Sequence, residues 1–170
     1  YGRMTYAADA RPMTTDTVFD LASLTKVIGT TTLAMMMVDE GRLDLDRKVS
    51  EFFPAFKGGG KEKVTIRHLL THSSGVDWWA PLYKEAKSMP EYLARIVPME
   101  LKYEPGAKSV YTDLGVMMLG DILERVSGSD LDTLVRTRLL GPLKMRDTGY
   151  RPPEFFFDDT ATTEIDNDWR

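Results

Sequence analysis

The stretch FDLASLTKVIGTTTLAMMMVDEG, residues 19–41, limits most strongly how this chain can fold. Apolar side chains occupy nearly every side of a helix drawn over residues 23–40, so we expect this helix to be buried almost all round. Gly41 follows it directly, at a position where glycine commonly ends a helix. The stretch therefore predicts a central core helix that needs neighbours on every side.

Lys26 breaks the local rule for the first turn of this helix. Ser23 is a good helix-capping residue, and the third position after it normally carries Glu or Gln, because the N-terminal end of a helix is electropositive. Residues three positions apart share a helix face, so the Ser23 hydroxyl and the Lys26 amine can meet. A serine becomes a nucleophile when a neighbouring base removes its proton. Burial and the positive helix end both lower the pKa of a lysine, which suits Lys26 to act as that base.

A Ser-x-x-Lys pair is a weak signal by itself. At ordinary residue frequencies it arises by chance about once in a chain of this size. The structural alternative is a capping Ser23 followed by a solvated Lys26, and only the surrounding sequence distinguishes the two interpretations.

Composition and charge narrow the class of protein. The 170 residues suffice for one domain with a real core, and the net charge of −4 argues against a nucleic-acid partner. There are no cysteines, which excludes disulfides and thiolate metal sites. The longest apolar run, residues 33–38, is far shorter than the roughly 20 residues of a membrane span. The chain starts at Tyr1 without a signal-peptide pattern, so we expect a part of a longer protein whose compartment and oligomeric state stay open.

The rest of the chain alternates expected helices with long loops. We expect the end of a strand at residues 1–8 and a turn at Gly58–Gly60. Further helices are expected after the capping residues Thr65, Ser88 with Glu91, and Ser129 with Asp132, and between Asp113 and Val126. Long loops in a compact domain are often functional.

Several segments, in order along the chain, resemble one known family: TVFDLASLTKV, GRLDLDRKV, VTIRHLLTHSSGV, EPGAKSVYTDLG and LLGPLKMRDTGY. They resemble the class C-like branch of the serine β-lactamase and penicillin-binding protein superfamily, which includes class C β-lactamases, D,D-peptidases and carboxylesterases. The resemblance runs from Thr17 to Tyr150, with a weaker continuation in ATTEIDNDWR. It implies an α/β (α+β) fold of the β-lactamase/D,D-peptidase type, here mainly the helical region with the nucleophile helix and only part of the sheet.

The resemblance also implies a role for each matched residue. Ser23 matches the nucleophile, Lys26 the lysine of the first motif, and Tyr111 the tyrosine of the second motif, which would activate Ser23 and later protonate the leaving group. Asp113 stands where the family commonly has asparagine. An ionised aspartate only accepts hydrogen bonds, and its charge would keep Lys26 protonated, leaving more of the proton transfer to Tyr111. A donor for an amide carbonyl is lost as well, so we expect ester substrates rather than β-lactams.

Two pairs of side chains have both a functional and a structural interpretation. Trp78 and Trp79 form either an aromatic wall over a substrate pocket or part of the core. His68 and His72 are spaced as zinc-binding histidines are, but Leu69 stands where a His-Glu-x-x-His motif has glutamate, and the chain has no third histidine. Helix packing and loop hydrogen bonds are the favoured interpretation of these histidines. We therefore expect no metal and no organic cofactor.

The third motif of the family, Lys-Thr-Gly or His-x-Gly, does not follow Tyr111 in this chain. We therefore expect residues 1–170 to be a partial domain, with the third motif and most of the sheet beyond residue 170. The predicted function is a serine hydrolase that forms an acyl-enzyme on a small-molecule ester, amide or lactam. The alternatives are a class C-like β-lactamase or D,D-peptidase, and a non-catalytic binding or scaffolding member of the same fold.

Overall fold

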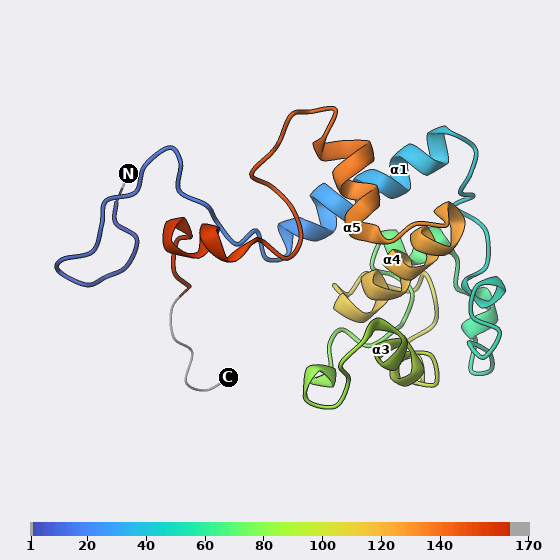
Figure 1. Ribbon diagram of the computed structural model, residues 1–170. Helices are drawn as coiled ribbons and strands as arrows, with labels where there is room; N and C mark the ends of the chain where they lie inside the picture. Colours follow the sequence, from blue (N-terminus) through green and yellow to red (C-terminus); the bar gives the residue numbers. More distant parts are fainter. Residues whose placement is uncertain (1, 164–170) are drawn as a thin grey trace.

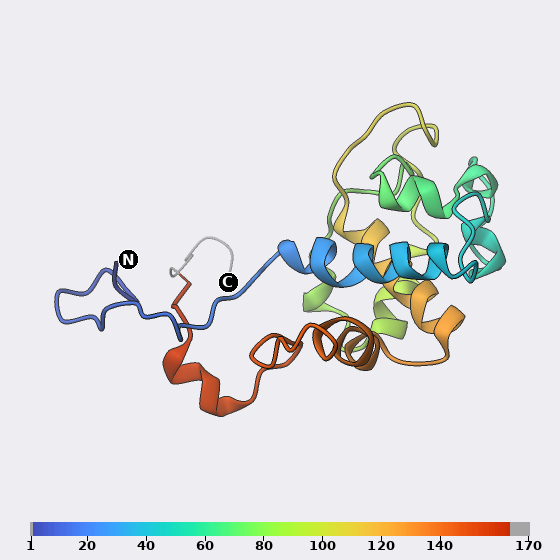
Figure 2. The same cartoon turned by 90° about the horizontal axis from the view of Figure 1, so that it is seen from above.

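The computed structural model describes residues 2–163, and its regular structure is almost entirely helical (Figure 1). A π-helical segment, η1 (Lys26–Thr31), continues without a break into α1 (Thr32–Asp39), and the two form one straight rod, which we call the central helix (Figure 2). The longest single helix is α4 (Asp113–Ser127). The shorter helices are η2 (Val49–Glu51), η3 (Lys61–Lys63), α2 (Ile66–Leu70), η4 (Leu82–Lys84), α3 (Met89–Ile96), α5 (Leu131–Leu134), η5 (Val135–Leu140) and η6 (Glu154–Asp159).

Within residues 2–163, extended segments pair only at isolated bridges. These bridges join Arg3 to Pro12, Val18 to Thr160 and Lys48 to Thr65. The strand expected at residues 1–8 is therefore reduced to the single bridge at Arg3, and Tyr1 lies outside the described residues. The N-terminal segment and η6 lie together, away from the helical body (Figure 1).

The central helix is buried on one side only. Leu33, Ala34 and Met37 are fully buried where the rod packs against α4 and η5. Leu24, Val27 and Met35, in contrast, are 58%, 60% and 65% exposed. The expectation of burial all round is therefore wrong for this face, because within residues 2–163 no element covers it.

The core lies between the central helix and helices α2, α3 and α4. Side chains of α4 at helical spacing, among them Met118 and Ile122, are fully buried and pack with Leu69 of α2 and Ile96 of α3. The helix starts at Asp113, as its sequence pattern indicates. It ends before Gly128, whose φ of +76° is the left-handed conformation that closes many helices.

Two predicted helix caps differ in the structure. Helix α3 begins after Ser88 as expected, but the Ser88 side chain makes no capping hydrogen bond, and Glu91 instead accepts from the main-chain N–H of Lys87 at 2.9 Å. Helix α5 is capped by Asp130, which accepts from Thr133 N at 2.9 Å, rather than by Ser129. Asp130 satisfies an N–H group in the first turn of α5, whereas Glu91 binds the chain just before α3.

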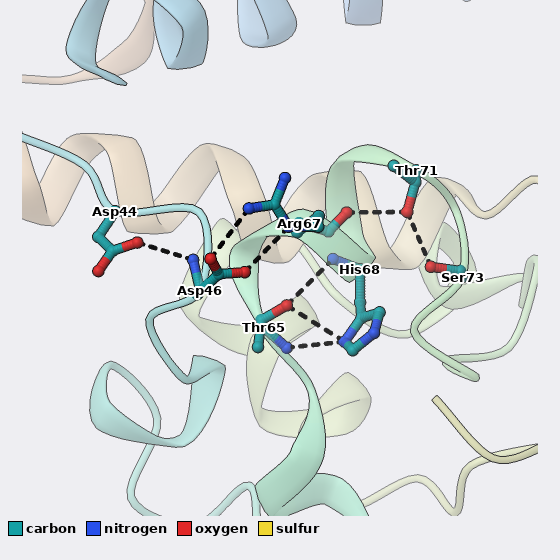
Figure 3. Close-up of polar contacts among 7 residues, drawn as sticks. All are labelled: Asp44, Asp46, Thr65, Arg67, His68, Thr71 and Ser73. Carbon is teal, nitrogen blue, oxygen red and sulfur yellow. Dashed lines mark hydrogen bonds and ion pairs between the residues drawn. The ribbon is translucent and has the colours of Figure 1, made fainter. Parts of the chain in front are cut away.

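Side-chain hydrogen bonds stabilise the start of helix α2 (Figure 3). Thr65 caps it, as predicted, by accepting from His68 N. Arg67 donates two hydrogen bonds to the carboxylate of Asp46, at 2.9 and 3.0 Å, which ties the preceding loop to the helix. This paired geometry is the more specific form of an arginine–carboxylate contact. It holds the start of α2 against the loop that contains Asp46.

None of the helices in the described part of the chain combines the length and the apolar character needed to cross a membrane.

Candidate active site

The chain enters the central helix through a strained turn. Ala22 has φ +44°, a left-handed conformation that is uncommon for a residue other than glycine. The Ala22 N–H donates to Asp20 Oδ1 at 2.8 Å. The Lys26 N–H donates to Ser23 O at 3.1 Å, which closes the first turn. Ser23 therefore lies in the first turn, as predicted, and it is exposed. Backbone strain of this kind concentrates at functional sites.

Two side chains converge on the Ser23 hydroxyl. Lys26 Nζ donates to Ser23 Oγ at 3.0 Å, across the helix face that the spacing predicted. Tyr111 OH donates to the same oxygen at 2.8 Å, although it lies 88 positions later in the chain. Lys26 Nζ also lies 5.2 Å from the centre of the Tyr111 ring. The predicted meeting of Ser23, Lys26 and Tyr111 is confirmed as geometry.

Asp113 completes this group through its contact with Lys26. Asp113 Oδ1 lies 2.8 Å from Lys26 Nζ. This oxygen is buried and accepts no well-aligned hydrogen bond, so the contact is an ion pair by distance rather than by hydrogen-bond geometry. The position of Asp113 in the same cluster agrees with the sequence analysis.

The pKa of Lys26 is raised, not lowered. Burial by itself lowers the pKa of Lys26, but the Asp113 carboxylate and the Tyr111 phenol together outweigh burial. The expectation of a lowered pKa is therefore wrong, because it counted burial and the helix end and gave less weight to Asp113. The consequence drawn from Asp113 holds, since Lys26 remains a cation and is a poor base in this arrangement.

Thr112 fixes the segment that carries Tyr111 and Asp113. It is fully buried, and its hydroxyl donates to Asp77 O at 2.6 Å and accepts from Gly115 N at 3.0 Å. The second of these bonds caps α4. Tyr111 and Asp113 flank Thr112 at this fixed helix start. The Tyr111 hydroxyl reaches Ser23, and the Asp113 carboxylate reaches Lys26.

His72 also contacts this segment, a role that its sequence pattern did not indicate. Its Nδ1 accepts from Thr112 N at 3.1 Å, and its ring centre lies 4.8 Å from that of Tyr111. His68, in contrast, bonds Thr65 at the start of α2. Both contacts agree with the structural interpretation of the histidines. Within residues 2–163, no group of three or more His, Asp or Glu side chains is arranged to hold a metal ion.

The two tryptophans differ in their surroundings. Trp78 is 54% exposed, and its main-chain O accepts from Asp113 N at 2.9 Å, which places its backbone beside the site. Trp79 is partly buried, and the two ring centres are 5.8 Å apart. The Trp78 side chain is thus the more exposed of the two.

A cavity of about 1000 Å³ lies along the other side of the central helix start. Its lining includes Thr25, Gly29, Tyr150 and Phe156, and it does not include the residues that converge on Ser23. The Ser23 cluster is therefore open to solvent and separate from this cavity.

Comparison with known proteins agrees with this geometry. The family model described as Beta-lactamase matches residues 1–170. The chain belongs to the β-lactamase family. Two curated relatives are an N-acetylmuramyl-L-alanine amidase of Bacillus subtilis (36% identical, 82% of this chain, 35% of the relative) and a putative D-alanyl-D-alanine carboxypeptidase of Salmonella paratyphi B (32% identical, 100% and 43%). The chain thus spans less than half the length of these relatives.

Solved structures of the same family show the same arrangement of helices. A class C β-lactamase superposes with a TM-score of 0.81 at 26% identity, over 95% of this chain and 44% of that protein. A hydrolase with promiscuous acyltransferase activity superposes with a TM-score of 0.77 at 30% identity, over 90% and 44%. The fold is therefore that of the serine β-lactamase and penicillin-binding protein superfamily, represented here mainly by its helical region.

Proposed function

We propose that this chain carries the nucleophile and the proton-transfer groups of a serine hydrolase that works through an acyl-enzyme. The observation that carries the proposal is the double contact on Ser23 Oγ, from Lys26 Nζ at 3.0 Å and from Tyr111 OH at 2.8 Å. This contact lies at the N-terminal end of a helix, where main-chain N–H groups lack intrahelical partners and favour a developing oxyanion.

In the proposed reaction, Ser23 Oγ attacks the substrate carbonyl carbon. Tyr111 first releases its own phenol proton to water. Its oxygen then takes the proton of Ser23 Oγ and passes it to the leaving group as the bond to that group breaks. The Lys26 cation stabilises the phenolate, and the Ser23 N–H supports the oxyanion. A water molecule then adds to the acyl-enzyme and releases the acyl group. No metal or organic cofactor takes part in this proposal.

For the substrate we propose an ester carbonyl. Asp113 supports this, because its carboxylate faces Lys26 and offers no N–H to hold an amide carbonyl. Trp78, whose main-chain O accepts from Asp113 N, has a half-exposed ring, and we propose this ring as the apolar surface for the acyl or alcohol part. The second candidate is an amide bond, favoured by the two curated relatives, whose names denote an amidase and a carboxypeptidase.

A fluorophosphonate probe tests the nucleophile, because it labels only an activated serine. We expect the complete protein to be labelled and Ser23→Ala to lose labelling entirely. Ser109→Ala is the matched control, since Ser109 lies near the site but its hydroxyl donates to Thr71 O. Equal labelling of the Ser23→Ala protein and the unaltered protein would contradict the proposal and would favour a non-catalytic role.

Kinetics with p-nitrophenyl esters and a chromogenic cephalosporin test the substrate class. We expect a higher kcat/KM for the esters, and a shift of the ratio toward the cephalosporin in Asp113→Asn, because asparagine restores an N–H donor. A higher kcat/KM for the cephalosporin in the unaltered protein would overturn the ester preference.

A further inference from the structure

His72 makes three contacts with Tyr111 and its two neighbours in the chain. The main-chain O of His72 accepts from Val110 N at 2.8 Å, and His72 Nδ1 accepts from Thr112 N at 3.1 Å. The two N–H groups that flank Tyr111 therefore both end on His72. The imidazole also lies against the phenol ring, with centres 4.8 Å apart and planes tilted by 36°. We infer that His72 is a positioning residue that holds the Tyr111 hydroxyl on Ser23.

The backbone of His72 is shaped for this contact. Its φ of +54° is left-handed, which is unusual for a residue other than glycine and is tolerated best by Asn, Asp and His. This conformation ends α2 and brings both the carbonyl and the ring of His72 to the extended segment around Tyr111. Tyr103 OH also donates to His72 O, at 3.3 Å. We call the contacts of His72 with Val110 N, Thr112 N and the Tyr111 ring the clamp. The clamp lies on a left-handed turn, and backbone strain of this kind is found at functional sites.

The turn that carries His72 is itself fixed on both sides. Ser73 N donates to His68 O at 2.8 Å, and Thr71 Oγ1 donates to Arg67 O at 2.9 Å. The Thr71 and Ser73 hydroxyls are 2.7 Å apart (Figure 3). Because Arg67 is bound to Asp46, this framework connects the clamp to the loop before α2. The imidazole is thus presented by a rigid element rather than by a free loop.

The clamp requires a neutral imidazole. Nδ1 accepts from a main-chain N–H, so it carries no proton, and the ring proton must be on Nε2. Protonation would set a donor against the Thr112 N–H and place a second cation near Lys26. Burial and then the charge of Lys26 lower the pKa of His72, while Asp113 opposes them. The phenols of Tyr111 and Tyr103 are its other titratable neighbours.

This inference rests on the proposed function, in which the Tyr111 oxygen must stay within hydrogen-bond reach of Ser23. A displacement of about 1 Å in such a group can cost on the order of 100-fold in rate. The contribution of His72 is therefore expected in kcat and in the rate of acylation, with little effect on substrate binding.

Two substitutions separate the parts of the clamp. His72→Phe keeps a ring against Tyr111 but removes the acceptor for Thr112 N. His72→Asn keeps an acceptor at nearly the same place, and asparagine tolerates a positive φ. His68→Phe is the matched control, because His68 Nδ1 also accepts from a main-chain N–H at 3.1 Å, that of Thr65, without contacting Tyr111.

In the complete protein we expect His72→Phe to lower kcat for a p-nitrophenyl ester by about 10- to 100-fold, with KM changed less than about threefold. His72→Asn should recover most of the lost kcat, and His68→Phe should keep the kcat of the unaltered protein. At acidic pH, protonation of His72 should reduce fluorophosphonate labelling of the unaltered protein. This loss of labelling should be absent in His72→Asn, which has no imidazole to protonate. Amide exchange at Thr112, followed by NMR, should become faster in His72→Phe and stay slow in His72→Asn.

Two results would overturn the inference: an unchanged kcat in His72→Phe, or the same loss of kcat in His68→Phe, which would indicate general destabilisation. Failure of the proposed function gives a different result. In that case the unaltered protein is not labelled above Ser23→Ala, while amide exchange at Thr112 still reports whether the clamp exists.

Discussion

At the scale of single residues, Lys26 occupies a position that is unfavourable for a helix and favourable for the cluster around Ser23. A cation in the first turn opposes the helix dipole. In the structure this cost is offset by the Asp113 carboxylate at 2.8 Å and by the Ser23 hydroxyl at 3.0 Å. Asp113 is itself the first residue of α4, where a negative charge is favourable. The positive charge of Lys26 at one helix start is thus neutralised by the negative charge of Asp113 at the other.

Asp113→Asn should lower the pKa of Lys26. The carboxylate that raises this pKa is removed, and burial, which lowers it, remains. A raised lysine pKa contributes stability that is present below 10.5 and is lost as the pH rises through the folded-state value. We therefore expect Asp113→Asn to lose less thermal stability than the unaltered protein as the pH rises above 10.5, in melting curves recorded from neutral to alkaline pH.

Asp121→Asn is the control for this measurement, because Asp121 lies on the same helix and pairs with Arg125 instead of Lys26. Its alkaline transition should follow that of the unaltered protein. Coincident alkaline transitions for Asp113→Asn and Asp121→Asn would contradict the assigned role of Asp113.

At the scale of elements, the helix ends show which local signals are reliable. Thr65 caps the start of α2 as predicted, and Gly128 closes α4 in the left-handed conformation. The cap of α5 moves by one residue, from Ser129 to Asp130. Several capping residues in a row make a helix start recognisable, but the backbone path decides which side chain reaches the free N–H.

Asp130→Ala should destabilise the protein, and Ser129→Ala should have little effect. The Asp130 carboxylate accepts from Thr133 N at 2.9 Å, and its removal leaves that N–H without its cap. We expect the melting temperature to fall by about 2–4 °C in Asp130→Ala, measured by circular dichroism. A larger fall in Ser129→Ala than in Asp130→Ala would show that Ser129 is the functional cap.

At the scale of the whole molecule, the central helix presents an apolar face that no element within residues 2–163 covers. Leu24, Val27 and Met35 lie on it, more than half exposed. Fully burying side chains of this size is worth about 1.5–3 kcal/mol each, against a total stability of about 5–15 kcal/mol for a typical domain. We propose that chain beyond residue 170 supplies the sheet that covers this face.

Residues 1–170 produced alone should bind a hydrophobic dye and should hydrolyse esters no faster than the Ser23→Ala control. Val27→Gln should reduce the dye binding of this piece, because it removes an apolar side chain from the exposed face. The same substitution should lower the melting temperature of the complete protein, where we expect Val27 to be buried. A monodisperse, cooperatively melting piece with Ser23-dependent esterase activity would contradict the proposed boundary.

Much of the site was predictable from local order along the chain. Residues 23 and 26 share a helix face because of the helical period, and the segment order of a known family pointed to Tyr111 and Asp113. The start of α2 followed from capping chemistry, and the extent of α4 followed from its sequence pattern. These features depend on neighbours within a few positions, or on a motif, and both can be read without coordinates.

Other features depended on which distant segments meet. The raised pKa of Lys26 and the contact of His72 with Tyr111 both arise between segments that are far apart in the sequence. So does the one-sided burial of the central helix, because an apolar pattern states what a helix can bury and not which neighbour is present. Electrostatics and strain are properties of the assembled site, since each depends on distances between atoms that sequence order alone does not determine.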